Sequence, residues 1–166
     1  MADLKLAYGT ASDVTITLAS LASDTSLLTG RESTAVDNTS ALVLDYLISG
    51  KITTGTTPTA SRSIEVWAVG SWDGTNWPDV FDGTESAETI TSADIKASIC
   101  RFVAAMATSA TSNVTYHFGP VSLAAAFGGV LPPKVVLFVT HSTAVALNST
   151  AGNHQVRLQP VFQTIN

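Results

Sequence analysis

One short stretch of the sequence gathers most of the side chains that could do chemistry. GSWDGTNWPDVFDGTES, residues 70–86, holds two tryptophans and four acids around two Asp-Gly pairs. No basic residue occurs between Arg62 and Lys96, whereas seven of the thirteen acids do. Clustered carboxylates could hold a hard cation or supply the acid pair of a glycoside hydrolase, and exposed tryptophans could stack on sugar rings.

The spacing of these acids argues against a metal site. A calcium-binding hand requires the pattern D-x-[DN]-x-[DN]-G, which this stretch lacks. A solvated acidic loop that keeps the protein soluble, or that docks on a basic neighbour, is favoured instead. We therefore predict that the chain binds no metal and no other cofactor.

The two tryptophans are interpreted first as parts of a β-hairpin. Asp73 and Gly74 follow an expected strand that ends at Trp72, and Gly74 can adopt the positive φ of a tight turn. Trp72 and Trp77 would then pack across the turn, as paired aromatic residues do in hairpins. A sugar-binding platform made of the same two rings stays open as the alternative.

The remaining reactive residue types form no recognisable catalytic pattern. The three histidines lie too far apart for a zinc motif, and Cys100, the only cysteine, sits in an apolar alternation typical of a packed side chain. A nucleophile elbow, a phosphate-binding loop and a dinucleotide fingerprint are all absent. We predict that the protein is not an enzyme. A glycosidase that uses the acids between Asp73 and Glu88 is the weakest hypothesis considered.

Composition and charge restrict the class of protein. The chain is 45% hydrophobic and only 13% charged, which leaves little charge to cover a surface and suggests burial against other subunits. Its net charge of -5 and its scattered basic residues disfavour a nucleic-acid partner. No stretch reaches the ~20 apolar residues of a membrane span, and no signal peptide is recognisable, so we expect synthesis in a reducing cytoplasm and no membrane partner. The length suits a single domain, residues 1–166.

Alternation of apolar and polar residues with period two is the dominant pattern, and it predicts half-buried strands. We expect about eight strands, interrupted by a helical turn after Ser92 and by another between Pro120 and Gly128. The fold class is therefore all-β, a two-sheet sandwich of the jelly-roll kind. The expected strands lie within residues 4–8, 14–18, 42–48, 62–72, 100–106, 114–118, 134–142 and 154–165.

Two of these strands carry more specific predictions. Residues 42–48 are apolar on nearly both faces, so this strand should be central in its sheet or covered by a partner. Pro160 cannot donate a ladder hydrogen bond, so the strand that contains it should lie at a sheet edge or carry a bulge.

Several stretches of the chain resemble a family of small structural proteins encoded by tailed bacteriophages. They are GRESTAVDNTSALVLDYLISGKITTG, the tryptophan-containing stretch of residues 70–86, FGPVSLAAAFGGVLPPK and HSTAVALNSTAGNH, 74 residues in all, and the likeness extends over most of the chain. The resemblance implies a component of the virion, made in the host cytoplasm. It implies no active site.

The favoured function is that of a capsid decoration, or cement, protein that binds the outside of the assembled head. A ring or adaptor protein of the tail or neck is the alternative, and a carbohydrate-binding module is the alternative from another class. The expected partners are the major capsid protein or other virion proteins, together with further copies of the chain, a trimer being one arrangement considered. The expected contact elements are loops 29–40 and 50–61 and the residues Arg31, Glu32, Trp72, Asp73, Trp77, Asp79 and Asp82.

Overall fold

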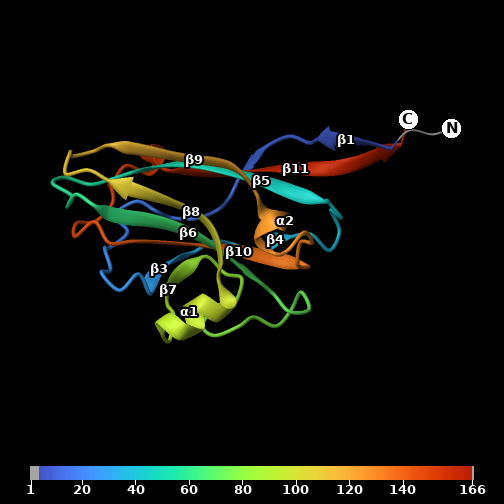
Figure 1. Ribbon diagram of the computed structural model, residues 1–166, viewed down its shortest axis with the longest axis horizontal. Helices are drawn as coiled ribbons and strands as arrows, with labels where there is room; N and C mark the ends of the chain where they lie inside the picture. The colour runs from blue at the N-terminus through green and yellow to red at the C-terminus, as the bar shows by residue number, and fades with distance from the viewer. Residues whose placement is uncertain (1–3, 166) are drawn as a thin grey trace.

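A computed structural model describes residues 4–165 as two stacked antiparallel β-sheets (Figure 1). Sheet A contains β1 (Leu4–Tyr8), β2 (Ser12–Asp13), β5 (Asp45–Thr53), β9 (Thr115–Ser122) and β11 (Gln155–Ile165). Sheet B contains β3 (Thr29–Glu32), β4 (Val36–Asp37), β6 (Arg62–Gly70), β7 (Ser86–Thr89), β8 (Arg101–Thr108) and β10 (Lys134–His141). The helical elements are α1 (Ala93–Ile99), α2 (Leu123–Ala126) and the 3-10 turn η1 (Ala151–Asn153).

The prediction of an all-β, two-sheet sandwich with short helical turns is confirmed. Both helices begin where the sequence indicated, because the hydroxyls of Ser92 and Ser122 accept hydrogen bonds from backbone N–H groups of the first turn. The described residues form eleven strands and not about eight. The short strands β2, β3, β4 and β7, of two to four residues each, were not expected, and one expected strand is not formed.

The strands pair in a nested order along the chain. β1 pairs with β11, β3 with β10, β5 with β9, and β6 with β8, all antiparallel. The resulting sheet orders are β1-β11-β5-β9 and β7-β3-β10-β6-β8. Because the first strand pairs with the last, β1 and the end of β11 lie side by side and project from one end of the sandwich (Figure 1).

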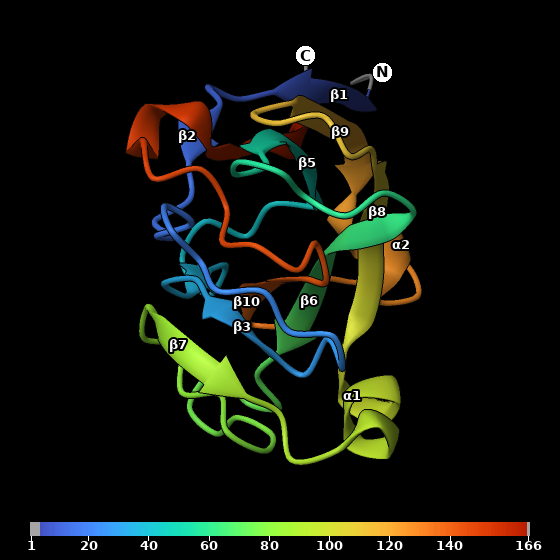
Figure 2. The ribbon, with the colours of Figure 1, turned by 90° about the vertical axis from the view of Figure 1, so that its left-hand side faces the viewer.

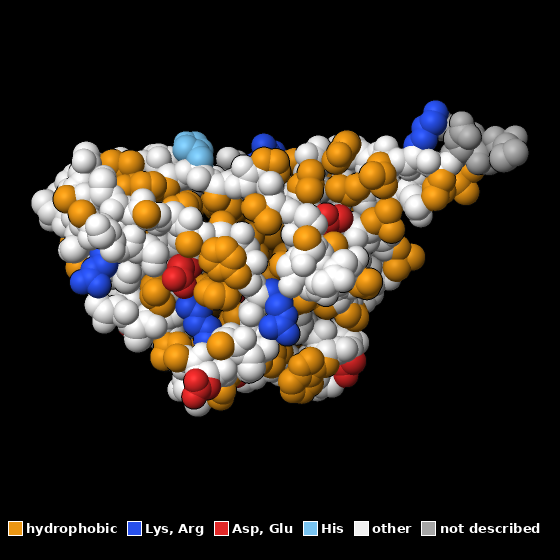
Figure 3. Space-filling view, viewed as in Figure 1, with side chains coloured by type: hydrophobic (Ala, Val, Ile, Leu, Met, Phe, Trp, Pro, Cys, Tyr) orange, Lys and Arg blue, Asp and Glu red, His pale blue; other side chains and the backbone are white. Residues whose placement is uncertain are grey.

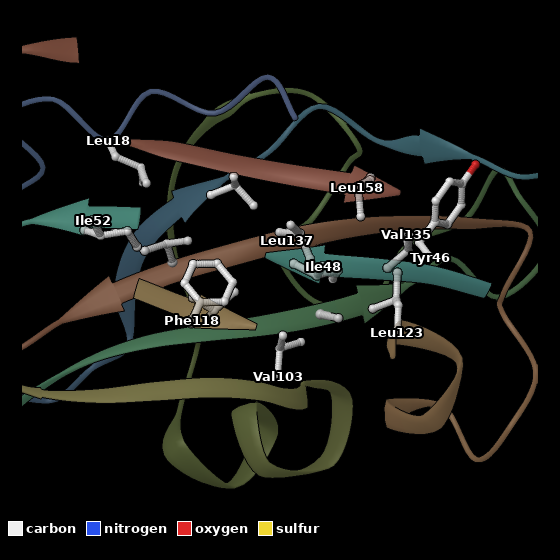
Figure 4. Close-up of a cluster of buried hydrophobic side chains, with 14 of the residues drawn as sticks. Leu18, Tyr46, Ile48, Ile52, Val103, Phe118, Leu123, Val135, Leu137 and Leu158 are labelled. Carbon is white, nitrogen blue, oxygen red and sulfur yellow. The ribbon is translucent and has the colours of Figure 1, made fainter. Parts of the chain in front are cut away.

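The main hydrophobic core fills the space between the two sheets (Figure 4). Alternate side chains of the long strands β5, β6 and β11 point into it, which is the pattern that the period-two alternation predicted. The buried side chains include Ile48, Ile52, Phe118, Val156 and Leu158 from sheet A, and Ile64, Val66, Val103, Leu137 and Val139 from sheet B.

A second apolar cluster covers the outer face of sheet B. It consists of Val69, Phe81, Ile90, Cys100, Val136 and Phe138, under a layer made by α1 and by the loops that precede and follow β7 in the segment 71–92 (Figure 2). β10 is therefore covered on both faces, and all of its residues except Lys134 are buried. Cys100 is a buried free thiol whose pKa is raised to about 11 by burial.

Most strand predictions are confirmed, and β5 is central in sheet A as expected. The strand expected over residues 14–18 is wrong, because only Ser12–Asp13 pair with β11 before the chain leaves the sheet. Its alternation still describes burial, since Leu18 is buried while Thr15 and Thr17 are exposed. In β8, a register shift against β6 breaks the alternation, so Val103 is buried and Phe102 is exposed.

Pro160 lies in an interior strand, so the prediction of an edge strand is wrong, and no register shift occurs at it in the β11–β5 pair. Its carbonyl accepts from the backbone N–H of Gly9 at 2.8 Å, so its own nitrogen faces the side of β1 and β2. On that side the partner is interrupted between Tyr8 and Ser12. The side chain of Gln159 donates to the Gly9 carbonyl at 3.4 Å, where a proline N–H would have been required.

The two segments expected to be contact loops are partly structural. Residues 29–40 contain β3 and β4, which pair with β10. Residues 50–61 begin as β5, and Thr54, Gly55 and Pro58 are buried after the strand ends. These segments therefore offer less free surface than their composition suggested.

Candidate functional site

The stretch that opened the sequence analysis does not form a hairpin. β6 ends at Gly70, and residues 71–77 make a tight turn without strands. Asp73 Oδ1 accepts from the backbone N–H groups of Thr75 and Asn76 at 2.8 and 2.7 Å. Gly74 has a φ of +86°, as predicted. The carboxylate of Asp73 thus holds the turn together, and the chain continues across sheet B and does not return along β6.

The two tryptophans lie in different environments, so the predicted packing across the turn is wrong. Trp77 is half-buried in the outer cluster, and its indole lies over Gly83, where an added Cβ would come within 3.1 Å of the ring. Trp72 is 72% exposed. A platform of two parallel tryptophan rings is therefore absent from this segment, and Trp72 alone presents an aromatic face to solvent.

Trp72 borders a shallow groove on the surface. The groove has a volume of about 260 Å³, and its walls come from the turn, from the end of α1 and from the segment after α2. Its lining includes Trp72, Pro78, Ile99, Arg101, Phe127 and Pro132. Arg101 donates to the carbonyl of Ser98 at 3.0 Å, which fixes its guanidinium beside the groove. An aromatic face beside a guanidinium can hold a flat or ring-shaped group by stacking and hydrogen bonding.

The aspartates of the predicted contact surface are used to hold turns. Asp79 accepts from the backbone N–H and the hydroxyl of Thr91, and Asp82 accepts from the backbone N–H of Thr84. Hydrogen bonds from Asn76 lower the pKa of Asp73. Among residues 4–165, no group of three or more His, Cys, Asp or Glu side chains is arranged to hold a metal ion.

Arg31 is also engaged within the protein. Its guanidinium makes two hydrogen bonds to Glu85, Nε to Oε1 at 2.5 Å and Nη2 to Oε2 at 2.7 Å. Glu85 Oε1 accepts in addition from the backbone N–H of Thr17, so this pair fastens β3 to the segment after β2. The hydrogen bond from Arg31 is the main cause that lowers the pKa of Glu85 to about 2.

Glu32, the next residue, is completely buried under the outer layer. Its Oε1 accepts from the backbone N–H of Gly83 at 2.8 Å, while its Oε2 has no hydrogen-bond partner. Burial raises the pKa of Glu32 to about 7, and the nearby charges of Asp82 and Glu88 act in the same direction. This carboxyl is therefore unavailable to a partner, although the sequence analysis placed it on the contact surface.

A buried ion pair beneath α1 was not anticipated from the sequence. The ammonium of Lys96 lies 3.1 Å from Glu65 Oε2, donates to the carbonyl of Leu27 at 2.7 Å, and stands 4.7 Å from the centre of the Trp67 ring. Trp67 Nε1 donates to the same carboxylate oxygen at 2.9 Å. The only signal in the sequence was the position of Lys96 beside Ile95, which packs against the outer cluster.

Large exposed hydrophobic side chains are concentrated outside the predicted contact surface. Besides Trp72, they are Leu4, Leu6, Tyr8, Leu42, Leu44, Phe102, Val130 and Ile165. Four of them lie on the projecting pair of strands β1 and β11, where Figure 3 shows hydrophobic side chains on the arm beside the termini. The sequence analysis missed this arm, because the alternation of Leu4, Leu6 and Tyr8 is the same pattern that a half-buried strand would have.

Comparison with models of known protein families, with characterised proteins and with solved structures gives no match for this chain. The resemblance to virion proteins of tailed phages stays a prediction from the sequence. None of the helices in residues 4–165 has the length and apolar character needed to cross a membrane.

Proposed function

We propose that this chain is a non-enzymatic structural protein of a tailed-phage virion, and that it decorates and stabilises the outside of the head. The observation that carries the proposal is the combination of a two-sheet sandwich with exposed apolar side chains, in a chain that is only 13% charged and in which, among residues 4–165, eight charged side chains form four internal ion pairs. A surface of this kind is suited to association with other proteins. The resemblance in residues 30–55, 70–86, 118–134 and 141–154 supplies the virion context.

The jelly-roll assignment forms part of the same proposal. The strand pairing is nested, as expected for a chain folded as one long, rolled hairpin. The first strand pairs with the last, and the pairs inside it are β3 with β10, β5 with β9 and β6 with β8. Jelly rolls occur in viral capsid proteins and in lectins, so this assignment supports the proposed role on the head.

The test uses phage particles that lack this protein. They should assemble with normal geometry but break at a lower temperature than complete particles, and purified protein added afterwards should restore their stability. Antibodies against the protein should label the head. Particles that fail to assemble, or that resist heat as well as complete ones, would contradict a decorating role. Label on the tail alone would favour the alternative of a tail or neck protein.

Carbohydrate binding is retained as a second candidate because Trp72 is exposed beside Arg101 at the groove. A pyranose ring could stack on the indole while its hydroxyls accept from the guanidinium. Trp72→Ala should then abolish binding to glycans in an array or calorimetric assay without changing the melting temperature. Trp77→Ala is the matched control, since Trp77 is half-buried and its ring is packed on Gly83. Absence of binding by the unaltered protein would exclude this function.

A further inference from the structure

The terminal ribbon, defined as residues 4–8 of β1 and 161–165 of β11, is the most exposed apolar element of the described chain. Leu4, Leu6, Tyr8 and Ile165 are 61, 63, 64 and 74% exposed. β5 pairs with β11 only as far as Val161, so beyond that residue the ribbon has two strands and extends past the sandwich (Figure 1). Isolated two-stranded ribbons are at best marginally stable in water, so this one is expected to gain stability from a further contact.

Among residues 4–165, one row of the backbone hydrogen-bonding groups of β1 has no partner. Gly9 donates to Pro160, and in an antiparallel pair alternate residues point to the same neighbour. The backbone N–H and C=O groups of Ala7 and Lys5 therefore point toward β11. The N–H and C=O groups of Leu4, Leu6 and Tyr8 point to the free edge of sheet A, and the exposed apolar side chains belong to these same residues.

This edge differs from the edges of native sheets that avoid association. Such edges are usually protected by charges, proline, bulges or very short strands. In sheet B, the edge strand β7 is short and carries Glu88. β1 has five residues and a single charge, Lys5, whose side chain lies on the opposite face from Leu4 and Leu6.

We propose that β1 pairs antiparallel with β1 of a second copy of the chain, about a two-fold axis that passes between the two Leu6 residues. In this register Leu4 lies opposite Tyr8 of the second copy, so all three outward-pointing residues of each strand exchange backbone hydrogen bonds. Sheet A continues across the contact as one sheet, and the two terminal ribbons support each other.

The charge pattern of the ribbon selects this register and suits a second copy as the occupant. An axis at Leu6 places Lys5 opposite Ala7 of the second copy, whereas an axis at Lys5 would place two ammonium groups opposite each other. The cross-strand pairs on the exposed face are then Leu6 with Leu6 and Leu4 with Tyr8, which are all apolar. The dimer contact is distinct from the trimer considered from the sequence, and it does not depend on the role in the virion.

Charge exchange at position 6 tests the contact, because this residue faces itself across the proposed axis. The unaltered protein should show a mass that rises from monomer to dimer in sedimentation equilibrium, over about 5 to 500 μM for a contact of this small size. Leu6→Lys and Leu6→Glu should each weaken the dimer about tenfold or more, since each puts like charges directly opposite. An equimolar mixture of the two variants should recover a dimer that contains one copy of each.

Two further proteins keep the test decisive. Val130→Lys changes an equally exposed apolar residue outside the ribbon and should dimerise like the unaltered protein. Leu4→Glu combined with Tyr8→Lys in one chain should dimerise as well, because the register places the new carboxylate of each copy opposite the new ammonium group of the other. Melting followed by circular dichroism checks that each variant is folded. A monomer at every concentration, dimerisation by Leu6→Lys equal to that of the unaltered protein, or a mixture that stays monomeric would each overturn the proposal. None of these results would affect the proposed role on the head.

Discussion

The buried carboxyl of Glu32 should make the stability of this protein fall as the pH rises from about 4.5 to 7. In the folded chain burial raises the pKa of Glu32 from 4.5 to about 7. Between these two values the folded state holds a proton that the unfolded state has released. Unfolding therefore releases a proton, and the free energy of unfolding decreases with increasing pH across this window.

The size of the effect follows from the same two values. A difference between a pKa of 4.5 and one of about 7 corresponds to roughly 3 kcal/mol, which is lost in full above the upper pKa. The unpartnered Oε2 is consistent with this cost, because an ionised Glu32 would leave a charged oxygen buried without a donor. Glu32→Gln keeps an oxygen to accept from Gly83 and removes the titration.

Urea denaturation of both proteins at pH 5, 6, 7 and 8 measures this difference. Relative to the unaltered protein, Glu32→Gln should gain about 2.5 kcal/mol between pH 5 and pH 8, which is a shift of roughly 5 to 10 °C in melting temperature. Glu88→Gln is the control, because it keeps the titrating carboxyl of Glu32 and removes only a nearby charge that raises the pKa of Glu32. Parallel stability curves for the unaltered protein and Glu32→Gln would refute the reasoning.

Three further predictions concern the ion pairs and the tryptophans. Arg31 lowers the pKa of Glu85 to about 2, so the stability that this pair contributes above pH 4.5 should be lost as the pH falls toward 2. The expected loss is on the order of 2 kcal/mol in the free energy of unfolding. Glu85→Gln should make stability less dependent on pH in this acid range. Lys96→Met should lower the free energy of unfolding by about 3 kcal/mol in urea denaturation, because it leaves the carboxylate of Glu65 under α1 without its cation. The added change Glu65→Gln should recover a large part of this loss. Equal stability of the single and double variants would contradict the proposed pairing. Trp77→Ala should lower the free energy of unfolding by roughly 2 to 3 kcal/mol, and Trp72→Ala by less than about 0.5 kcal/mol, as judged by melting temperature. The reverse order would contradict the packing described for these two residues.

The environments of the residues predicted to form a contact surface were harder to predict than the fold. Asp73, Asp79 and Asp82 are acidic in a loop, and acidic loop residues generally face solvent, but here their carboxylates hold turns by accepting backbone hydrogen bonds. Arg31 and Glu32 are adjacent in sequence, yet one is bonded to Glu85 and the other is buried under the outer layer. Of the residues predicted to form the contact surface, Trp72 alone presents a large exposed apolar side chain.

The sequence by itself determined the local structure of this protein. Period-two alternation predicted β5, β6 and β11, because each of these strands places every second side chain in the core. Serine hydroxyls marked the starts of both helices, and Gly74 marked a turn with positive φ. These signals act within a few residues of the chain, so they can be read without knowing what lies on either side.

Only the tertiary structure decided which of these elements meet and which groups they bury. The pairing of β1 with β11 joins residues from opposite ends of the chain, and it leaves Leu4, Leu6 and Tyr8 exposed although their alternation is that of a half-buried strand. The outer layer of residues 71–92 decides that Glu32 and Trp77 are covered while Trp72 is not. The burial of a side chain and the pKa of a titratable group depend on the residues that folding brings close to it. Many of these residues are far away along the chain, so the sequence around a side chain does not reveal them.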